Sequence, residues 1–140
     1  MAHDFASFTK ELEGFVQATE EAMTGALRDI VVKVGTTVIN FSPVLTGRFK
    51  GNWQMTVGSP SKNSLNVEDP DGAETIADLK IMASTLNPGE IAYIVNNITY
   101  GYNIETIGWA QTPPYMPVQR TLSEFTELVN EAIIKNRVKG

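Results

Sequence analysis

The hydrophobic positions at the start of the chain repeat with the period of an α-helix. From Phe5 onward, large apolar residues recur at alternating intervals of three and four, which is typical of one helical stripe. The pattern predicts a helix over about 5–40, roughly 50 Å long. A compact globule of this size has a radius of gyration of about 14 Å, so the helix must kink or protrude. Gly25 and Gly35 are candidate break points, and the β-branched run 30–39 is an alternative strand.

After Ser42 and Pro43, apolar and polar residues alternate one by one, and the helical spacing ends. Proline cannot continue the helical hydrogen bonds, so the helix is expected to end there. Residues 49–57 alternate between apolar and polar side chains, which predicts an antiparallel strand with one face in water. The polar segment 59–72 contains two prolines and a glycine, and is expected to be an exposed, mobile loop.

A second helix and two more strands are expected after this loop. Asp71 and Glu74 have the spacing of a capping box, and the helix that they begin should continue until the Asn-Pro-Gly sequence at 87–89. The short apolar run 91–95 predicts an interior strand. A further strand is expected near 100–105.

The last helix is expected to begin near Pro114 or Pro117, because proline is tolerated in the first turn of a helix. Its buried stripe should consist of apolar residues at helical spacing, namely Val118, Leu122, Phe125, Val129, Ala132 and Ile133. The order of elements predicts a single α+β domain over 1–140. The domain is expected to have a long N-terminal helix and a small, mostly antiparallel sheet. The middle helix and the C-terminal helix are expected to pack on this sheet.

Composition narrows the function classes. The 140 residues include no cysteine, which excludes disulfides, thiol nucleophiles and cysteine-based metal sites and favours assembly inside a cell over secretion. The start of the chain lacks the pattern of a signal peptide. No stretch of about eighteen apolar residues is present, so no membrane-spanning helix is expected.

The net charge of −5 is concentrated in one stretch. Residues 66–78 contain five acidic side chains and no Lys or Arg, so the rest of the chain has 16 − 5 = 11 acids against 11 bases. The imbalance therefore concerns a local surface. Glu68 and Asp69 precede the predicted helix cap, and they are candidate contacts with a partner or with a ring lumen.

Catalytic and cofactor chemistry has little support in this sequence. His3 is the only histidine, so a Ser-His-Asp triad or a histidine metal cage cannot form within one chain. The phosphate-binding glycine motifs are absent, and no cofactor is expected. The segment 69–72 is similar to the start of a calcium loop, but it lacks the later ligands and is better explained as a turn before a helix. An acid pair for hydrolysis could come from Glu90, Glu105 or the acidic loop at 69–72, although nothing selects a pair.

Aromatic side chains do not predict a nucleic-acid site here. Arg48 and Lys50 are the only basic pair near an aromatic strand, whereas binding to single strands combines stacked aromatic rings with a basic groove. A solvated sheet face explains these residues better.

The segment 42–53, S-P-V-L-T-G-R-F-K-G-N-W, resembles the S-P-V-x-T-G-R-L-x-x-S-W signature of the tail-completion proteins of tailed bacteriophages, also called neck or head–tail connector proteins. A second block over 93–108 resembles the family pattern V-x-N-x-x-P-Y-A-x-x-L-E-x-G, and a third is the Pro- and Met-bearing segment 113–117. The resemblance spans roughly 5–137. The motif positions are Pro43, Thr46, Gly47, Arg48, Trp53, Asn97, Tyr100, Glu105 and Gly108.

These motif residues also have a structural explanation. Pro43 would stop the first helix, Thr46 would bond its own loop, Gly47 would permit a positive φ, and Trp53 would anchor the strand in the core. The motif is therefore expected to form a structural corner and not a catalytic site.

The resemblance implies a structural virion protein and not an enzyme. Its subunits would form a ring, a hexamer or dodecamer, in the neck between the head and the tail. Its partners would be further copies of itself, the head-closure or connector protein, and the tail terminator or tail tube protein. DNA would pass through only as cargo, no membrane would be involved, and assembly would occur in the host cytoplasm. The alternatives are an accessory tail or capsid protein that binds a virion surface, and an acidic-site hydrolase.

Overall fold

The computed structural model describes the backbone of residues 5–44 and 46–137, and it shows an α+β fold. Before residue 19, only the side chains of Thr9, Lys10 and Glu13 are described. His3 and Leu45 lie outside the described residues. The elements, in chain order, are α1 (Phe5–Asn40), η1 (Lys50–Asn52), β1 (Trp53–Val57), α2 (Ala73–Ala83), β2 (Ala92–Asn96), η2 (Asn103–Ile107), α3 (Pro117–Ser123) and α4 (Phe125–Lys135).

The predicted N-terminal helix is confirmed, and it is continuous. α1 contains 36 residues, which corresponds to about 54 Å, and it passes through both Gly25 and Gly35 without a break. A Cβ atom at Gly25 would overlap Asn136, and one at Gly35 would overlap the side chain of Leu79. Both glycines therefore allow close packing of neighbouring elements, and the strand alternative for 30–39 is wrong.

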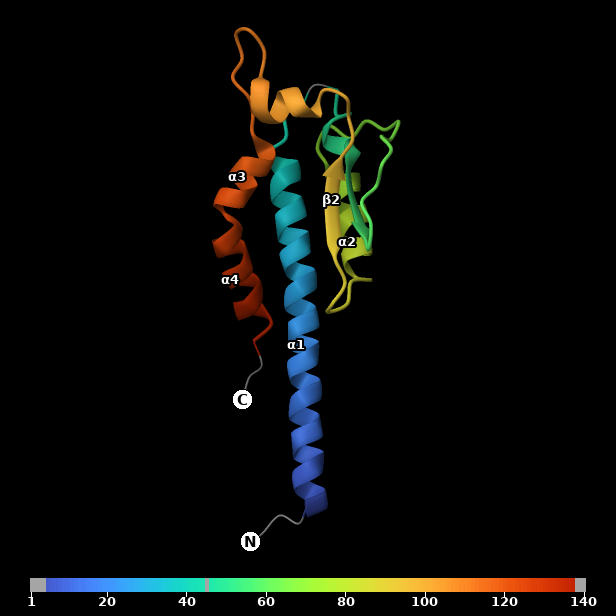
Figure 1. Ribbon diagram of the computed structural model, residues 1–140, viewed down its shortest axis with the longest axis vertical. Helices are drawn as coiled ribbons and strands as arrows, with labels where there is room; N and C mark the ends of the chain where they lie inside the picture. The colour runs from blue at the N-terminus through green and yellow to red at the C-terminus, as the bar shows by residue number, and fades with distance from the viewer. Residues whose placement is uncertain (1–4, 45, 138–140) are drawn as a thin grey trace.

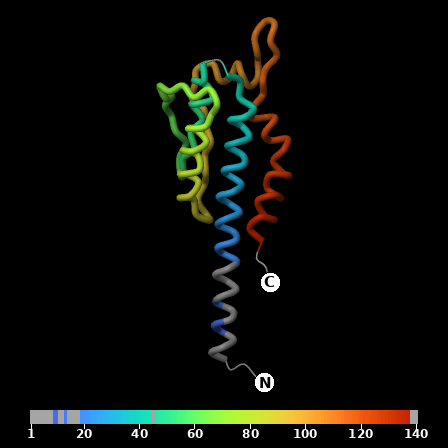
Figure 2. Tube along the Cα trace, turned by 180° about the vertical axis from the view of Figure 1, so that it is seen from behind, coloured from blue at the N-terminus to red at the C-terminus, as the bar shows by residue number. Residues whose placement is uncertain are grey.

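α1 is the spine of the molecule. α2 and the two strands lie on one side of it, and α3 and α4 lie on the other (Figure 1), as the view from behind also shows (Figure 2). Two contacts mark how far this packing extends toward the N-terminus: Arg28 Nε donates to the Leu86 carbonyl at 2.7 Å, and Asn136 Nδ2 donates to Asp29 at 2.7 Å. The N-terminal part of α1, residues 5–24, extends past the ends of α2 and α4 (Figure 1). We call this part the shaft.

The sheet has two antiparallel strands. β1 pairs with β2 in a register that runs from Trp53 opposite Asn96 to Val57 opposite Ala92. The core lies where α1, α2 and the sheet meet, and its most buried members are Ile39, Ala83, Leu86 and Ile104, each at most 1% exposed. Within the described ranges, no helix combines the length and the apolar character needed to cross a membrane.

Three strand predictions need correction. The strand predicted over 91–95 forms as β2, but it is not interior, because its sheet has two strands in the described structure and its five residues are all half-buried. The predicted strand over 49–57 begins only at Trp53, because Lys50–Asn52 form a 3₁₀ turn. The strand expected near 100–105 is wrong: residues 103–107 form a π-helical turn, closed by a 2.7 Å hydrogen bond from the Gly108 amide to the Asn103 carbonyl. This turn buries Ile104 completely. The aromatic and β-branched residues that favoured a strand here therefore lie in a helical turn.

The C-terminal helix is divided and exposes much of its apolar stripe. α3 and α4 meet at Glu124, and the residues that α3 buries are Pro117 and Thr121. Arg120 stacks over the Phe41 ring at 4.1 Å and helps to fix this rotation of α3 on α1. Ala132 is buried and Val129 half-buried as predicted, whereas four stripe residues are exposed: Val118, Leu122, Phe125 and Ile133.

Candidate functional site

The first motif forms a corner between α1 and β1. Ser42 Oγ donates to the Val38 carbonyl at 2.7 Å and accepts from Trp53 Nε1 at 2.8 Å, so the indole is fixed to the last turn of α1. Trp53 is 9% exposed, and its ring meets Phe49 edge to face with centroids 5.7 Å apart. The predicted anchoring of β1 by Trp53 is therefore confirmed.

Gly47 holds the centre of this corner. Its φ of 89° lies in the left-handed region that favours glycine. Its carbonyl accepts from the amides of Gly51 and Asp69, both at 2.9 Å, and a Cβ atom would overlap the backbone nitrogen of Pro70. The predicted positive φ is confirmed, and the close approach of the 59–72 loop is a second reason for glycine here.

The other residues of the first motif have unequal roles. Thr46 Oγ1 accepts from the Arg48 amide at 3.3 Å, as predicted for a bond within the loop. Pro43 follows the end of α1 and is half-buried, while Arg48 is exposed. The corner therefore leaves the guanidinium of Arg48 at the surface.

Two asparagines bind the 59–72 loop to the sheet. Asn52, which is 0% exposed, donates to the carbonyls of Arg48 and Leu65 at 2.6 and 3.1 Å and accepts from the Leu65 amide at 2.6 Å. Asn97 donates to the carbonyls of Ser61 and Asn63 at 2.9 and 3.2 Å. The predicted face in water included Lys50 and Asn52, and that prediction is wrong for both, because the turn before β1 buries them. The mobility of the loop stays a prediction.

The second motif stabilises the start of α3. Glu105 Oε1 accepts from the Val118 amide at 2.8 Å and Oε2 from the Gln119 amide at 3.1 Å. These are first-turn amides without helical partners, so the carboxylate acts as a cap. Gly108, at φ 70°, passes so close to the Thr112 carbonyl that a Cβ atom would overlap it. Tyr100 lies beside Phe49, with ring centroids 6.5 Å apart.

Asp69 supplies the cap of α2. Gly72, at φ 77°, occupies the N-cap position, and the predicted capping box between Asp71 and Glu74 does not form. Asp69 Oδ2 instead accepts from the Thr75 amide at 2.8 Å and from the Thr75 hydroxyl at 2.6 Å. Burial alone would raise the pKa of Asp69, but the hydrogen bonds from Thr75, with others at Asp71 and Gly72, lower it below 3.8.

The acidic stretch 66–78 thus separates into three roles. Asp69 is 7% exposed and has a structural role, so it is unsuited to the surface contact that the sequence suggested. Glu68 is exposed, and its role as a partner or lumen contact stays a prediction. Asp71 Oδ1 accepts from the Ala73 amide at 3.0 Å. Glu74 and Asp78 lie on α2 and line a cavity.

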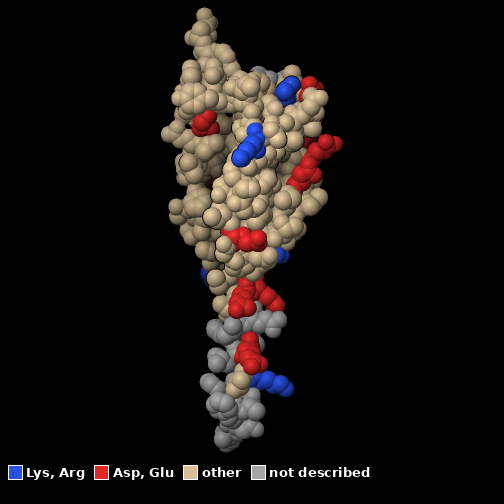
Figure 3. Space-filling view, turned by 45° about the vertical axis from the view of Figure 1, so that its right-hand side comes forward, with Lys and Arg blue, Asp and Glu red and all other residues tan. Residues whose placement is uncertain are grey.

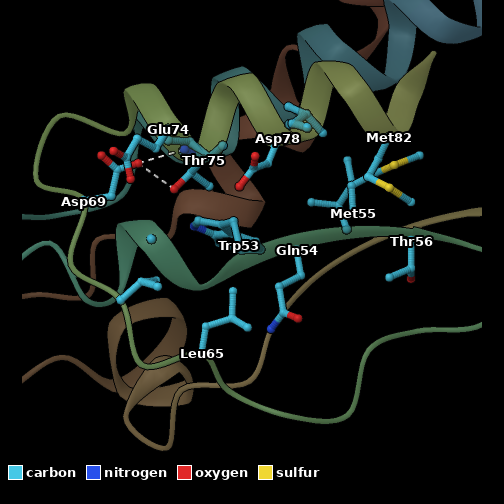
Figure 4. Close-up of a pocket in the computed structure, with 16 residues that line it drawn as sticks. Trp53, Gln54, Met55, Thr56, Leu65, Asp69, Glu74, Thr75, Asp78 and Met82 are labelled. Carbon is cyan, nitrogen blue, oxygen red and sulfur yellow. Dashed lines mark hydrogen bonds between the residues drawn. The ribbon is translucent and has the colours of Figure 1, made fainter. Parts of the chain in front are cut away.

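This cavity, of about 250 Å³, lies between α2, β1, α1 and the loop. Figure 4 shows Asp78 directed from α2 toward β1, Trp53 beneath it, and Met55 facing Met82. Apolar side chains form most of its floor, and Glu74 and Asp78 form an acidic wall; no Lys or Arg is among the described residues that line it. We call this cavity the acidic groove.

The described structure gives a structural contact to each acid that the sequence named individually as a hydrolase candidate. Among the side chains that the structure describes, no group of three or more His, Asp or Glu residues is placed to hold a metal ion. Glu90 accepts from the Asn87 amide at 2.7 Å, and Glu105 caps α3, so both candidate acids have a structural hydrogen bond. Figure 3 shows acidic side chains spread along one face, from the globular part to the shaft.

Comparison of the chain with models of protein families, with curated proteins and with solved structures found no match in any of the three.

Proposed function

We propose that this chain is a structural protein of the bacteriophage neck, which forms a ring that completes the tail and joins it to the head connector. The proposal begins with the three blocks that resemble tail-completion proteins. Two of these blocks coincide with structural corners: Gly47 and Trp53 fix β1 to α1, and Glu105 fixes α3. A motif that serves as a scaffold suits a protein that acts through its surfaces.

The shaft is the observation that carries the proposal. α1 contains 36 residues, yet its packing against α2 and α4 extends only to about Gly25, where Asn136 lies against it. A helix in a protein gains most of its stability from the packing of its apolar face against a partner, and a helix without such a partner is only marginally stable. The sequence of the shaft has apolar residues at positions 5, 8, 12 and 15, so a neighbouring subunit is the natural partner for it.

A ring also needs a second, different patch on each subunit, because head-to-tail contacts join unlike surfaces. The exposed stripe on α3 and α4 supplies apolar area for such a contact. Leu122 is 62% exposed, Phe125 43% and Val118 39%. α3 and α4 lie on the side of α1 opposite to α2 (Figure 1).

The end of the molecule opposite to the shaft offers a contact for an axial partner. The segment between η2 and α3 projects there (Figure 1), and Trp109 forms an isolated bridge with Thr112 inside it. Trp109 is 45% exposed, and Ile107 is 59% exposed. Exposed aromatic and aliphatic side chains of this kind are typical of protein contacts, so we assign this end to the head-side or tail-side neighbour in the neck.

Deletion of the gene from the phage that encodes it tests the function. Negative-stain images of the mutant lysate should show full heads and complete tails that remain unjoined, and the gene supplied in trans should restore joined particles. Intact particles that adsorb poorly would instead support the accessory tail or capsid protein. An activity that disappears in Glu90→Gln or Glu105→Gln without a change in assembly would support the hydrolase.

Gene order is a quicker check. Portal, head-closure and tail-tube genes beside this gene are the expected neighbours of a neck protein. A location among genes for cell lysis or metabolism would contradict the proposal.

A further inference from the structure

We propose that the acidic groove binds the C-terminal end of α4 from a second copy of the chain. This proposal rests on the ring-forming role proposed above, and it adds a charged contact between neighbouring copies to those of the shaft and of the exposed stripe.

The shape and chemistry of the groove determine what it can bind. Its volume is about 250 Å³, whereas an apolar cavity of about 150 Å³ already holds a benzene-sized group. Leu65 and Val67, on its loop side, are 39% and 43% exposed. A large aliphatic side chain fits this floor. A neighbouring cation would be needed to match Glu74 and Asp78, because no basic side chain lines the groove in the described structure.

The end of α4 has the complementary composition. Residues 132–140 contain Lys135, Arg137 and Lys139 and no acid. Two adjacent aliphatic residues precede these bases, and both point away from the packed side of the helix: Ile133 is 51% exposed and Ile134 is 60% exposed. Apolar and cationic groups therefore occur together here, as the groove requires.

Part of this basic end is already used within the subunit. Lys135 Nζ lies 3.5 Å from Asp29 Oδ2, and its side chain is 68% exposed. Arg137 is exposed, and only its backbone is placed in a hydrogen bond, from its amide to the Ile134 carbonyl at 3.3 Å. Arg137 is therefore the described base that we assign to the groove of the next copy, and the sequence has a further base, Lys139, two positions after it.

Within one molecule, α1 separates the groove from the described part of the basic end. α2 with its groove lies on one side of α1, and α4 lies on the other, in both views of the chain (Figures 1 and 2). A contact between them joins unlike patches on successive copies, which is the arrangement that closes into a ring when the rotation divides a full circle. Opposite charges across the contact also make it sensitive to salt.

Charge-swap variants of the full chain test this contact by sedimentation velocity at low salt. The groove variant is E74K/D78K and the tail variant is R137E/K139E. The control is E124K/E127K, which makes the same charge change as the groove variant at two exposed positions, Glu124 between α3 and α4 and Glu127 on α4. Each of the first two should need a concentration about tenfold or more higher for half-association. A mixture of the two should regain wild-type association, and the control should behave as the wild type.

Three outcomes would overturn the contact: a wild-type chain that stays monomeric at low salt, a groove or tail variant that associates normally, or a mixture that does not regain association. Thermal unfolding first shows that each variant is folded. If E74K/D78K is not folded, E74Q/D78N removes the charge without reversing it, and a weakened self-association of this variant is then expected.

Complementation of the deletion phage separates this proposal from the neck function. If the groove variant restores joined particles as well as the wild type, the contact is wrong while the neck function stands. If the deletion leaves joined particles but the charge swap is seen in solution, the neck function is wrong while the contact stands.

Discussion

Asp69 connects three parts of the molecule through one side chain and its own backbone. Its amide donates to the Gly47 carbonyl in the corner, while its carboxylate caps α2 through Thr75. The residue therefore couples the loop, the corner and the helix. A carboxylate that accepts hydrogen bonds while buried stabilises the fold only as long as it is ionised.

The substitution Asp69→Asn should lower the free energy of unfolding at neutral pH by about 1–3 kcal/mol, because the charged acceptor of the Thr75 amide and hydroxyl is lost. Urea unfolding measures the change. Glu68→Gln is the matched control, since Glu68 is adjacent and exposed, and it should change the stability little. Equal losses in both variants would contradict the assigned cap.

The pH dependence of these variants has a defined sign. The pKa of Asp69 is lowered in the folded chain relative to its ordinary value of 3.8. Its stabilising contribution is therefore present above 3.8 and is lost as the pH falls through the folded pKa. Urea unfolding from neutral pH to below 3.8 should show the difference between wild type and Asp69→Asn shrinking on the acid side. A constant difference would refute the linkage.

Alanine substitutions at Gly47 and Gly58 distinguish two causes of lost stability: a positive φ, and steric overlap with a neighbouring segment. Both have φ near 90°, but a Cβ atom at Gly58 would meet nothing within 4 Å, whereas one at Gly47 would overlap Pro70. Gly58→Ala should cost roughly 1 kcal/mol, and Gly47→Ala should cost about 3 kcal/mol or more. Chemical denaturation compares them, and equal costs would show that the loop does not press on the corner.

At the scale of elements, the start of α3 depends on a residue from another element. Glu105→Gln should lower the stability by about 0.5–2 kcal/mol, because the charged cap of the Val118 and Gln119 amides is weakened. Hydrogen exchange of these two amides should accelerate more than exchange elsewhere in α3. Glu124→Gln, an exposed position without a side-chain cap bond, is the control and should leave both amides protected.

The elements also show where sequence patterns succeed. α1 was predicted over nearly its whole length, because its apolar stripe repeats for many turns and Ser42-Pro43 marks its end. The period of apolar residues identifies the apolar face of a helix, but it does not show which element packs against that face. The same spacing therefore predicted burial of Leu122 and Phe125, although α3 turns Thr121 toward α1. The turn at 103–107 could not be predicted either, because the burial of Ile104 by distant residues overrides local strand preference.

In the candidate site, too, local features were predicted and features that depend on distant contacts were not. Gly47 and Trp53 were predicted, since a positive φ and an aromatic anchor are local consequences of residue type. The acidic groove was not predicted, because it is formed by residues from segments that are distant in the sequence and that only the fold brings together. The capping box failed for a similar reason: Asp69 reaches Thr75 from outside the expected four-residue window.

At the scale of the whole molecule, the shaft should be dispensable for folding and required for assembly. A chain that begins at Glu21 keeps the contacts of Arg28 and Asp29, so its melting temperature should stay within about 4 °C of the wild type. It should not restore joined particles to the deletion phage. Circular dichroism and complementation measure the two effects. A truncated chain that unfolds, or one that complements, would contradict this assignment.

The unbroken course of α1 has a mechanical consequence. A continuous helix transmits a rotation of the globular part to its free end as a lever arm does. The shaft is about 30 Å long, so a tilt of about 10° near Gly25 displaces its tip by about 5 Å, which is roughly one helical turn. A small change in the orientation of the globular part thus shifts the tip of the shaft by the spacing of one helical turn. A partner that binds the tip therefore fixes the orientation of the subunit within a narrow range of angles.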